Sequence, residues 1–180
     1  WQSEKCCKGT QKNSRGPMDL ISTLIDADKL RAKNHHEEAR QLLVQLAAEF
    51  PTNPVVQYKT ACVYDFLGRE REAIPYYHAA IENDLPDTDL RGAYLGLGST
   101  YRTLGQYAES KKILLEGLSR FPDANEMKVF LAMTLYNLGE NHEAVSSLLQ
   151  VITETTTDEK IENYERAIRF YAEDLDKKWD

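Results

Sequence analysis

The sequence predicts an all-α protein, an α-solenoid of four helix-turn-helix units followed by a C-terminal capping helix. Three kinds of residue recur along the chain at the same intervals of 34, 37 and 34 positions. One is a small residue in the first helix of each unit, at Ala27, Ala61, Gly98 and Ala132. Another is a small residue early in the second helix, at Ala39, Ala73, Ser110 and Ala144. The third is the residue of the intervening turn, at Asn34, Gly68, Gly105 and Gly139. Three sets of residues that recur at the same intervals indicate an internal repeat, in which facing small residues let two helices approach closely.

The third unit shows the plan of a repeat most clearly. Tyr94, Leu97, Gly98 and Tyr101 follow one another at steps of three, one and three, which places them on one stripe of an α-helix. Gly98 costs about 1 kcal/mol relative to alanine inside a helix, a cost that is tolerated where a neighbouring helix comes very close. Phe121-Pro122 ends the second helix, because proline cannot continue it.

The same unit carries the residues that point to a family. They are Tyr94, Leu97, Gly98, Tyr101, Gly105, Tyr107 and Pro122. A 34-residue helix-turn-helix unit with these positions resembles the tetratricopeptide repeat. The resemblance extends from Leu20 to about Asp158, and it implies a curved stack whose first helices line a concave, protein-binding side. Through the stretches GLGSTYRTLG and FLAMTLYNLG, the whole chain is also similar to a bacterial group of compact proteins of this family without an assigned biochemical role.

The chain departs from the family pattern at four positions. Asn34 stands in place of a turn glycine, and Ser110 and Gly117 stand where the family usually has alanine. The fourth unit ends at Thr156 without a proline. Each substitute is small or compatible with a turn, so we expect the packing of the repeats to be kept.

We expect the chain to divide into a leader, four repeats and a cap. Residues 1–17 show neither helical nor strand periodicity. They are expected to be a disordered leader or an added segment, with Met18 as the natural start. The repeats are expected within 18–158, at about 20–53, 54–90, 91–124 and 125–158, and the amphipathic capping helix at 159–180. Asp19 precedes the first helix, where an acidic residue suits the helix dipole.

Three later features modify the repeat plan. Pro75 is expected near the start of a second helix, close to the turn, where a missing donor costs little. The interval of 37 places an insertion in the polar stretch 83–89, which is expected to be a surface loop. The final helix is expected to cover the last repeat with one apolar stripe, formed by Ile161, Tyr164, Ile168, Tyr171 and Leu175. A role for this helix in binding a separate partner is the alternative.

Charge disfavours a nucleic-acid partner. The leader has four basic residues and one acidic residue, so the rest of the chain has 22 − 4 = 18 basic and 29 − 1 = 28 acidic residues, a net charge of −10. Such a charge repels a phosphate backbone. No apolar run approaches the ~20 residues of a membrane span, so a membrane partner is not expected either.

The residue types that catalyse reactions or bind cofactors do not form a recognisable motif. The three cysteines, Cys6, Cys7 and Cys62, do not form a disulfide framework and suggest a reducing compartment, most simply the cytoplasm. The four histidines show no HExxH spacing, and no phosphate-binding loop or Gly-x-Ser-x-Gly motif is present. We therefore expect no enzyme activity, no cofactor and no bound metal.

The candidate binding residues are side chains of the first helices that lie off the packing stripe. They are Leu24, Asp28 and Arg31 in the first unit, Tyr58, Cys62, Asp65 and Phe66 in the second, Leu95, Ser99 and Arg102 in the third, and Val129, Met133, Tyr136 and Asn137 in the fourth. Aromatic residues, methionine and arginine are enriched in interface cores. The alternative is that part of this set packs against neighbouring helices.

These observations predict a non-enzymatic protein–protein interaction scaffold that binds a peptide or partner helix on the concave face. The alternative is a self-assembling structural repeat protein without a peptide ligand, and a homo-oligomer is compatible with the sequence. A lysine and asparagine clamp, with which some family members bind carboxylates, is absent, because Leu24 and Asp28, then Tyr58 and Cys62, occupy the matching positions. A partner with basic residues is instead expected to meet Asp28 and Asp65.

Overall fold

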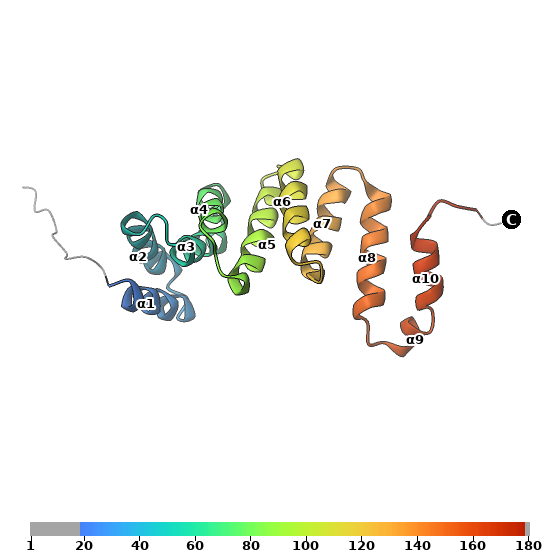
Figure 1. The fold of residues 1–180 in the computed structure, drawn as a ribbon, viewed down its shortest axis with the longest axis horizontal. Coiled ribbons are helices and arrows are strands. Elements are labelled where there is room, and N and C mark those ends of the chain that lie inside the picture. Colours follow the sequence, from blue (N-terminus) through green and yellow to red (C-terminus); the bar gives the residue numbers. More distant parts are fainter. Residues whose placement is uncertain (1–18, 179–180) are drawn as a thin grey trace, which may run out of the picture.

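The computed structural model describes residues 19–178, and this part of the chain contains helices and connecting turns but no strand. Ten helices follow one another along an elongated stack, from α1 at one end to α10 at the other (Figure 1). They are α1 (Leu20–Ala32), α2 (His36–Glu49), α3 (Pro54–Phe66), α4 (Glu70–Glu82), α5 (Asp87–Thr103), α6 (Tyr107–Arg120), α7 (Asn125–Asn137), α8 (Asn141–Thr155), α9 (Glu159–Glu162) and α10 (Glu165–Ala172). The prediction of an all-α solenoid is confirmed. The expectations for residues 1–17 and Met18, with Cys6 and Cys7, lie outside the described residues.

From α1 to α8 each helix packs against the next along the chain, so the core runs through the stack as a series of helix–helix layers. The first helices of successive units also contact each other, α3 with α5 and α5 with α7. We call the surface formed by α1, α3, α5 and α7 the first-helix face.

The turn inside each unit has the conformation that the repeat predicts. The four turn residues all have positive φ, with values of 62° for Asn34, 68° for Gly68, 75° for Gly105 and 81° for Gly139. In every unit the next amide donates to the carbonyl oxygen five residues earlier. These hydrogen bonds run from His35 to Leu30, Arg69 to Tyr64, Gln106 to Tyr101 and Glu140 to Leu135. This pairing satisfies carbonyl groups at a helix end, and it needs a left-handed residue that glycine or asparagine supplies most readily.

The small residues lie where two helices touch. The recurring small residue of the first helix and that of the second helix are both buried in all four units. A Cβ on Gly98 would overlap the side chain of Leu114, so the glycine allows α5 and α6 their close approach. Ser110, which replaces the usual alanine, is fully buried and donates to the carbonyl oxygen of Gly98 at 2.7 Å. A hydrogen bond of 3.0 Å joins its hydroxyl to that of Thr134, so the serine links three helices.

The insertion between the second and third units extends a helix. Residues 87–89, expected in a loop, form the first turn of α5, which has 17 residues where α3 has 13. Only residues 83–86 remain as the connection, with Asp84 at a φ of 57° and Leu85 buried. The boundary expected at 90/91 therefore falls inside α5. Leu90 is buried, which gives the added turn an apolar contact with the core.

Pro75 lies farther into its helix than expected. It is the sixth residue of α4, and the amide of Ala73 already donates to the carbonyl oxygen of Arg69. Pro75 therefore removes one hydrogen bond from the helix interior. Its missing donor is therefore not one of the amides that are unpaired at the start of a helix, which was the reason to expect a small cost.

The C-terminal segment is divided where one continuous helix was expected. The chain breaks at residues 163–164 between α9 and α10, and α10 packs against α8. Because of this break, the expected stripe does not form one buried face: Ile168 is half-buried, whereas Tyr164 and Tyr171 are exposed. The amide of Leu175 donates to Nε2 of His142 at 3.2 Å, which joins the end of the segment to the start of α8.

Candidate functional site

A hollow of about 440 Å³ opens between α3, α4 and α5. It is lined by Cys62, Asp65 and Phe66 of α3, Glu70 and Tyr77 of α4, and Ser99, Thr100 and Thr103 of α5. Four of the predicted binding residues, Cys62, Asp65, Phe66 and Ser99, therefore share one site. The hollow lies between two first helices, so it belongs to the first-helix face.

Helical spacing and one glycine explain how these side chains meet. Residues 62, 65 and 66 lie on one side of α3, and residues 99, 100 and 103 have a similar spacing on α5. Tyr77 reaches the site from α4 because Gly96 has no side chain. A Cβ on Gly96 would overlap the Tyr77 ring and hydroxyl.

Asp65 is the central polar group of the hollow. Its carboxylate accepts hydrogen bonds from the hydroxyl groups of Tyr77 and Thr100, each at 2.7 Å. Burial raises the pKa of the Asp65 carboxyl above its ordinary value, the two hydroxyl donors oppose this rise, and the nearby carboxylate of Glu70 adds to it. None of the ion pairs within the described part of the chain includes Asp65.

An aromatic ring forms one rim of the hollow. Phe66 is 63% exposed, and its ring stacks on the imidazole of His36 with centroids 3.8 Å apart. His36 thus supports the ring from α2. Neither ring nitrogen of His36 has a hydrogen-bond partner among the described residues.

The thiol of Cys62 lies on the inner wall. Burial raises its pKa, although the hydroxyls of Tyr58 and Tyr77 and the charge of Arg31 oppose the rise. A thiol with a raised pKa stays protonated at neutral pH and is a poor nucleophile. Burial also raises the pKa of Tyr58 and of Tyr77, so both hydroxyls remain neutral donors.

Several other predicted residues contact neighbouring helices. Leu24 packs against two buried clusters that α1, α2 and α3 form, and Leu95 packs against the cluster around Leu114. Tyr58 lies against Tyr77, with ring centroids 6.3 Å apart, and its hydroxyl fills the space beside Gly92. These side chains contribute to the helix packing of the first-helix face.

The acidic residue of the first unit already has a cationic neighbour. Lys59 of α3 donates to both carboxylate oxygens of Asp28, at 2.9 and 2.8 Å. A basic partner would have to displace this lysine from Asp28. Of the two acidic residues predicted to meet a partner, Asp28 and Asp65, it is Asp65 that lacks an ion pair with a described residue.

The remaining predicted residues follow the face outside the hollow. Arg31, Arg102, Val129, Met133 and Asn137 are half-buried, and Tyr136 is 68% exposed. Nε of Arg102 and Oδ1 of Asn137 are buried and have no hydrogen-bond partner among the described residues. The structure does not bring this group into the hollow.

Four residues of the hollow were absent from the predicted set: Glu70, Tyr77, Thr100 and Thr103. Thr103 could have been included, because the repeat intervals align it with Phe66 and Asn137, which were predicted. No sequence pattern shows that the Tyr77 hydroxyl reaches Asp65. Thr100 lies one position beyond Ser99, a predicted residue of α5.

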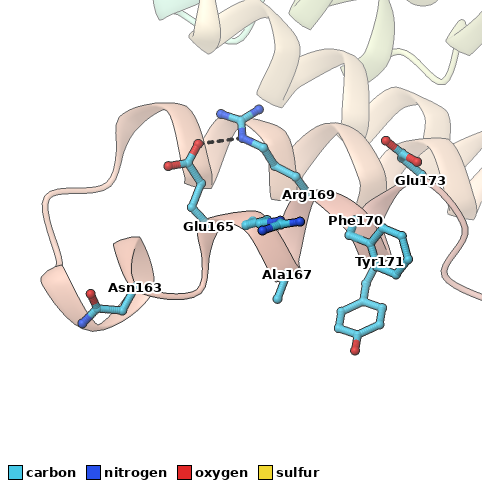
Figure 2. Close-up of a pocket in the computed structure, with 8 residues that line it drawn as sticks. Asn163, Glu165, Ala167, Arg169, Phe170, Tyr171 and Glu173 are labelled. Atoms are coloured by element: carbon cyan, nitrogen blue, oxygen red, sulfur yellow. Dashed lines mark hydrogen bonds and ion pairs between the residues drawn. The ribbon is translucent and has the colours of Figure 1, made fainter.

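A larger open depression, of about 820 Å³, lies on α10 (Figure 2). All of its lining residues fall within 163–173, so only one short segment forms it. Figure 2 shows the ion pair between Arg169 and Glu165, 2.8 Å long, on the same segment that carries Phe170 and Tyr171. No second element brings polar groups to it, and we therefore consider the hollow around Asp65 the better candidate site.

Residues 19–178 contain neither a cluster of metal ligands nor a membrane-spanning helix. These residues contain no group of three or more His, Cys, Asp or Glu side chains placed to hold a metal ion. No described helix combines the length and apolarity that a membrane span requires.

Comparison with known proteins agrees with this architecture. The family model described as tetratrico peptide repeat matches residues 54–175, which is more than half of the chain. The chain belongs to the tetratricopeptide repeat family. Its first unit precedes the matched residues, but α1 and α2 are joined by the same positive-φ turn as the other units.

Solved structures share the fold of this tetratricopeptide repeat protein at low sequence identity. A MamA fragment from Desulfovibrio magneticus RS-1 is 16% identical with a TM-score of 0.70, covering 78% of each chain. A crystal structure of MamA protein is 18% identical with a TM-score of 0.69, covering 82% of this chain and 77% of MamA. YrrB, described as a TPR protein with an unusual peptide-binding site, is 19% identical with a TM-score of 0.67, covering 88% of this chain and 80% of YrrB. None of the curated protein sequences that were compared matches the chain.

Proposed function

We propose that this protein is a non-enzymatic scaffold that binds a peptide or a partner helix along the first-helix face. The observation that carries the proposal is the hollow between α3 and α5, where an exposed aromatic ring, hydroxyl groups and a half-buried carboxylate converge. Binding sites commonly combine apolar area with a few placed polar groups. The described peptide-binding site of YrrB, a protein of similar fold, supports the proposal by analogy alone.

The chemistry of the site favours binding over catalysis. The Cys62 thiol is held protonated by burial, and no histidine or lysine lines the hollow to accept its proton. A nucleophile needs a nearby base that is available to accept its proton. These groups are better suited to fixing the position of a bound side chain.

A peptide selection with a blocking variant tests the proposal. Peptides selected from a random displayed library against the intact chain are to be measured by isothermal titration calorimetry. Thr103→Trp places a large ring in the mouth of the hollow at an exposed position, and we expect it to weaken binding by at least ~10-fold. Gln41→Trp, on the exposed side of α2, is the matched control and should leave affinity unchanged. Strong loss with Gln41→Trp and none with Thr103→Trp would place the partner on the opposite side.

Self-assembly is a second candidate, favoured by uncovered apolar side chains at both ends of the stack. On α1, Ile21 and Ile25 are 69% and 49% exposed, and near α10 Tyr164 is 67% exposed. End-to-end contacts between copies would cover them. Sedimentation velocity over a 100-fold range of concentration tests this candidate, since an oligomer that Ile25→Glu abolishes would support it and a constant monomer would exclude it.

We further propose that the partner is a protein in the cytoplasm, and neither a nucleic acid nor a membrane. The net charge of −10 on residues 18–180 disfavours a nucleic acid as the partner. The free thiol of Cys62 is consistent with a reducing compartment.

A further inference from the structure

The hollow around Asp65 is acidic and contains no basic side chain. Its eight lining residues include two carboxylates, Asp65 and Glu70, and no lysine, arginine or histidine. Asp28, on the same face, is by contrast neutralised by Lys59. Asp65 is half-buried and its hydrogen-bond partners are both neutral hydroxyls, so a cation bound beside it would stabilise its charge.

The other walls suit a cationic side chain as well. The exposed ring of Phe66 borders the mouth, and an aromatic face attracts a lysine or arginine head group. The hydroxyls of Ser99 and Thr103 also line the hollow and can accept hydrogen bonds from an ammonium or guanidinium. Asp65 and Phe66 come from α3, Glu70 from α4, and Ser99 and Thr103 from α5, so the packing of three helices fixes the arrangement.

We infer that the hollow receives one basic side chain, lysine or arginine, of the bound peptide. The inference rests on the proposed function and names the chemistry of the partner at this site. The charge of Asp65 provides specificity, and the ring of Phe66 holds the aliphatic part of the side chain.

The neighbouring units suggest what surrounds this basic residue. The repeat intervals of 34 and 37 align Asp65 with Arg31 in the preceding unit and Arg102 in the following one. Neither arginine takes part in an ion pair within the described residues. A peptide along the face would thus meet positive, negative and positive positions in turn, which favours a basic residue with acidic residues on both sides.

Small probes separate this inference from the proposed function. The intact ¹⁵N-labelled chain is to be titrated with the N-acetyl, N-methylamide forms of lysine, arginine, norleucine and glutamate, and amide chemical shifts followed. We expect lysine and arginine to produce saturable shifts at Asp65, Ser99 and Thr103, with norleucine and glutamate at least ~10-fold weaker. Asp65→Asn, which keeps oxygen and nitrogen atoms able to pair with both hydroxyls, should abolish the preference for the basic probes.

Glu70→Gln is the second variant and keeps the test informative if Asp65→Asn does not fold. It should reduce the affinity for the lysine probe several-fold, whereas Glu116→Gln, on the exposed side of α6, should not. Equal shifts with norleucine, or an unchanged lysine affinity in both hollow variants, would overturn the inference. If selected peptides bind the first-helix face but carry no basic residue at the hollow, the inference fails while the proposed function stands. If no peptide binds that face, the proposed function fails independently of the probe result.

Discussion

The hydroxyl of Tyr77 donates a 2.7 Å hydrogen bond to the carboxylate of Asp65 and so joins α4 to α3 beneath the hollow. Without this hydroxyl the half-buried Asp65 carboxylate keeps only the Thr100 donor, and the loss of a hydrogen bond to a charged acceptor destabilises a protein by about 1–3 kcal/mol. We therefore expect Tyr77→Phe to lower the free energy of unfolding by about that amount, measured by urea denaturation. Tyr107→Phe, at a tyrosine outside the hollow, serves as the control. An unchanged urea midpoint for Tyr77→Phe would show that this hydrogen bond contributes nothing.

Asp65 should give the stability of the protein a specific pH dependence. Its pKa is raised in the folded state above the ordinary value of 3.8, mainly by burial. Because the folded protein then binds the proton more tightly than the unfolded chain, the contribution of Asp65 to stability falls as pH rises from about 3.8 through the raised pKa. The titratable groups that face it are Cys62 on α3 and Glu70 and Tyr77 on α4.

This pH dependence is tested by comparing the stability of Asp65→Asn with that of the parent chain. The variant should gain stability relative to the parent as pH rises from about 3.5 to 7, because it lacks the buried charge. Urea midpoints at a series of pH values give this difference directly. A difference that stays constant with pH, or that changes in the opposite direction, would contradict the raised pKa.

The close helix contacts at the small residues make a packing prediction. Ala61 and Ala132 are 0% and 1% exposed, so a leucine at either position would force neighbouring helices apart. Each substitution should cost about 1–3 kcal/mol by overpacking. Ala32→Leu, at an exposed position of α1, is the control and should be close to neutral. Wild-type denaturation midpoints for both buried variants would mean that the assigned contacts are not close.

The C-terminal segment should protect the last repeat from self-association. Ending the chain before Asp158 removes α9 and α10 and uncovers the side of α8 against which α10 packs. Exposed apolar surface promotes association, so the shortened chain should dimerise or aggregate at concentrations where the full chain does not. Light scattering after size-exclusion chromatography measures this. A shortened chain with the mass and stability of the full chain would exclude a capping role.

Most of the fold could be predicted from the sequence, because the same constraints on turns and helix contacts apply in each unit. A left-handed turn residue, as at Gly68, and a buried small residue in the first helix, as at Gly98 and Ala132, recur in every unit, so one unit predicts the others. The errors arose where the chain leaves the period. The three extra residues could have lengthened either the loop or α5, and burial of Leu90 in the added turn favours the helix. The break at residues 163–164 has no repeat to predict it.

The candidate site was predictable only in part, for a similar reason. Helical spacing placed Cys62, Asp65 and Ser99 on one face, and the structure brings them into one hollow. Spacing along one helix does not reveal pairs between helices, so the hydrogen bond from Tyr77 and the ion pair between Lys59 and Asp28 could not be foreseen. These two contacts decide which acidic residue remains available to a partner.

Site-specific photocrosslinking tests the central claim, that a partner peptide lies in the hollow of the first-helix face, most directly. A benzoylphenylalanine is to be placed at Phe66, where an exposed aromatic ring already lines the hollow, in one variant and at Gln41 in another, and each is irradiated with the tightest selected peptide. We expect a crosslinked product from position 66, competed away by the unlabelled peptide, and none from position 41. A product from position 41 with none from position 66 would contradict the claim.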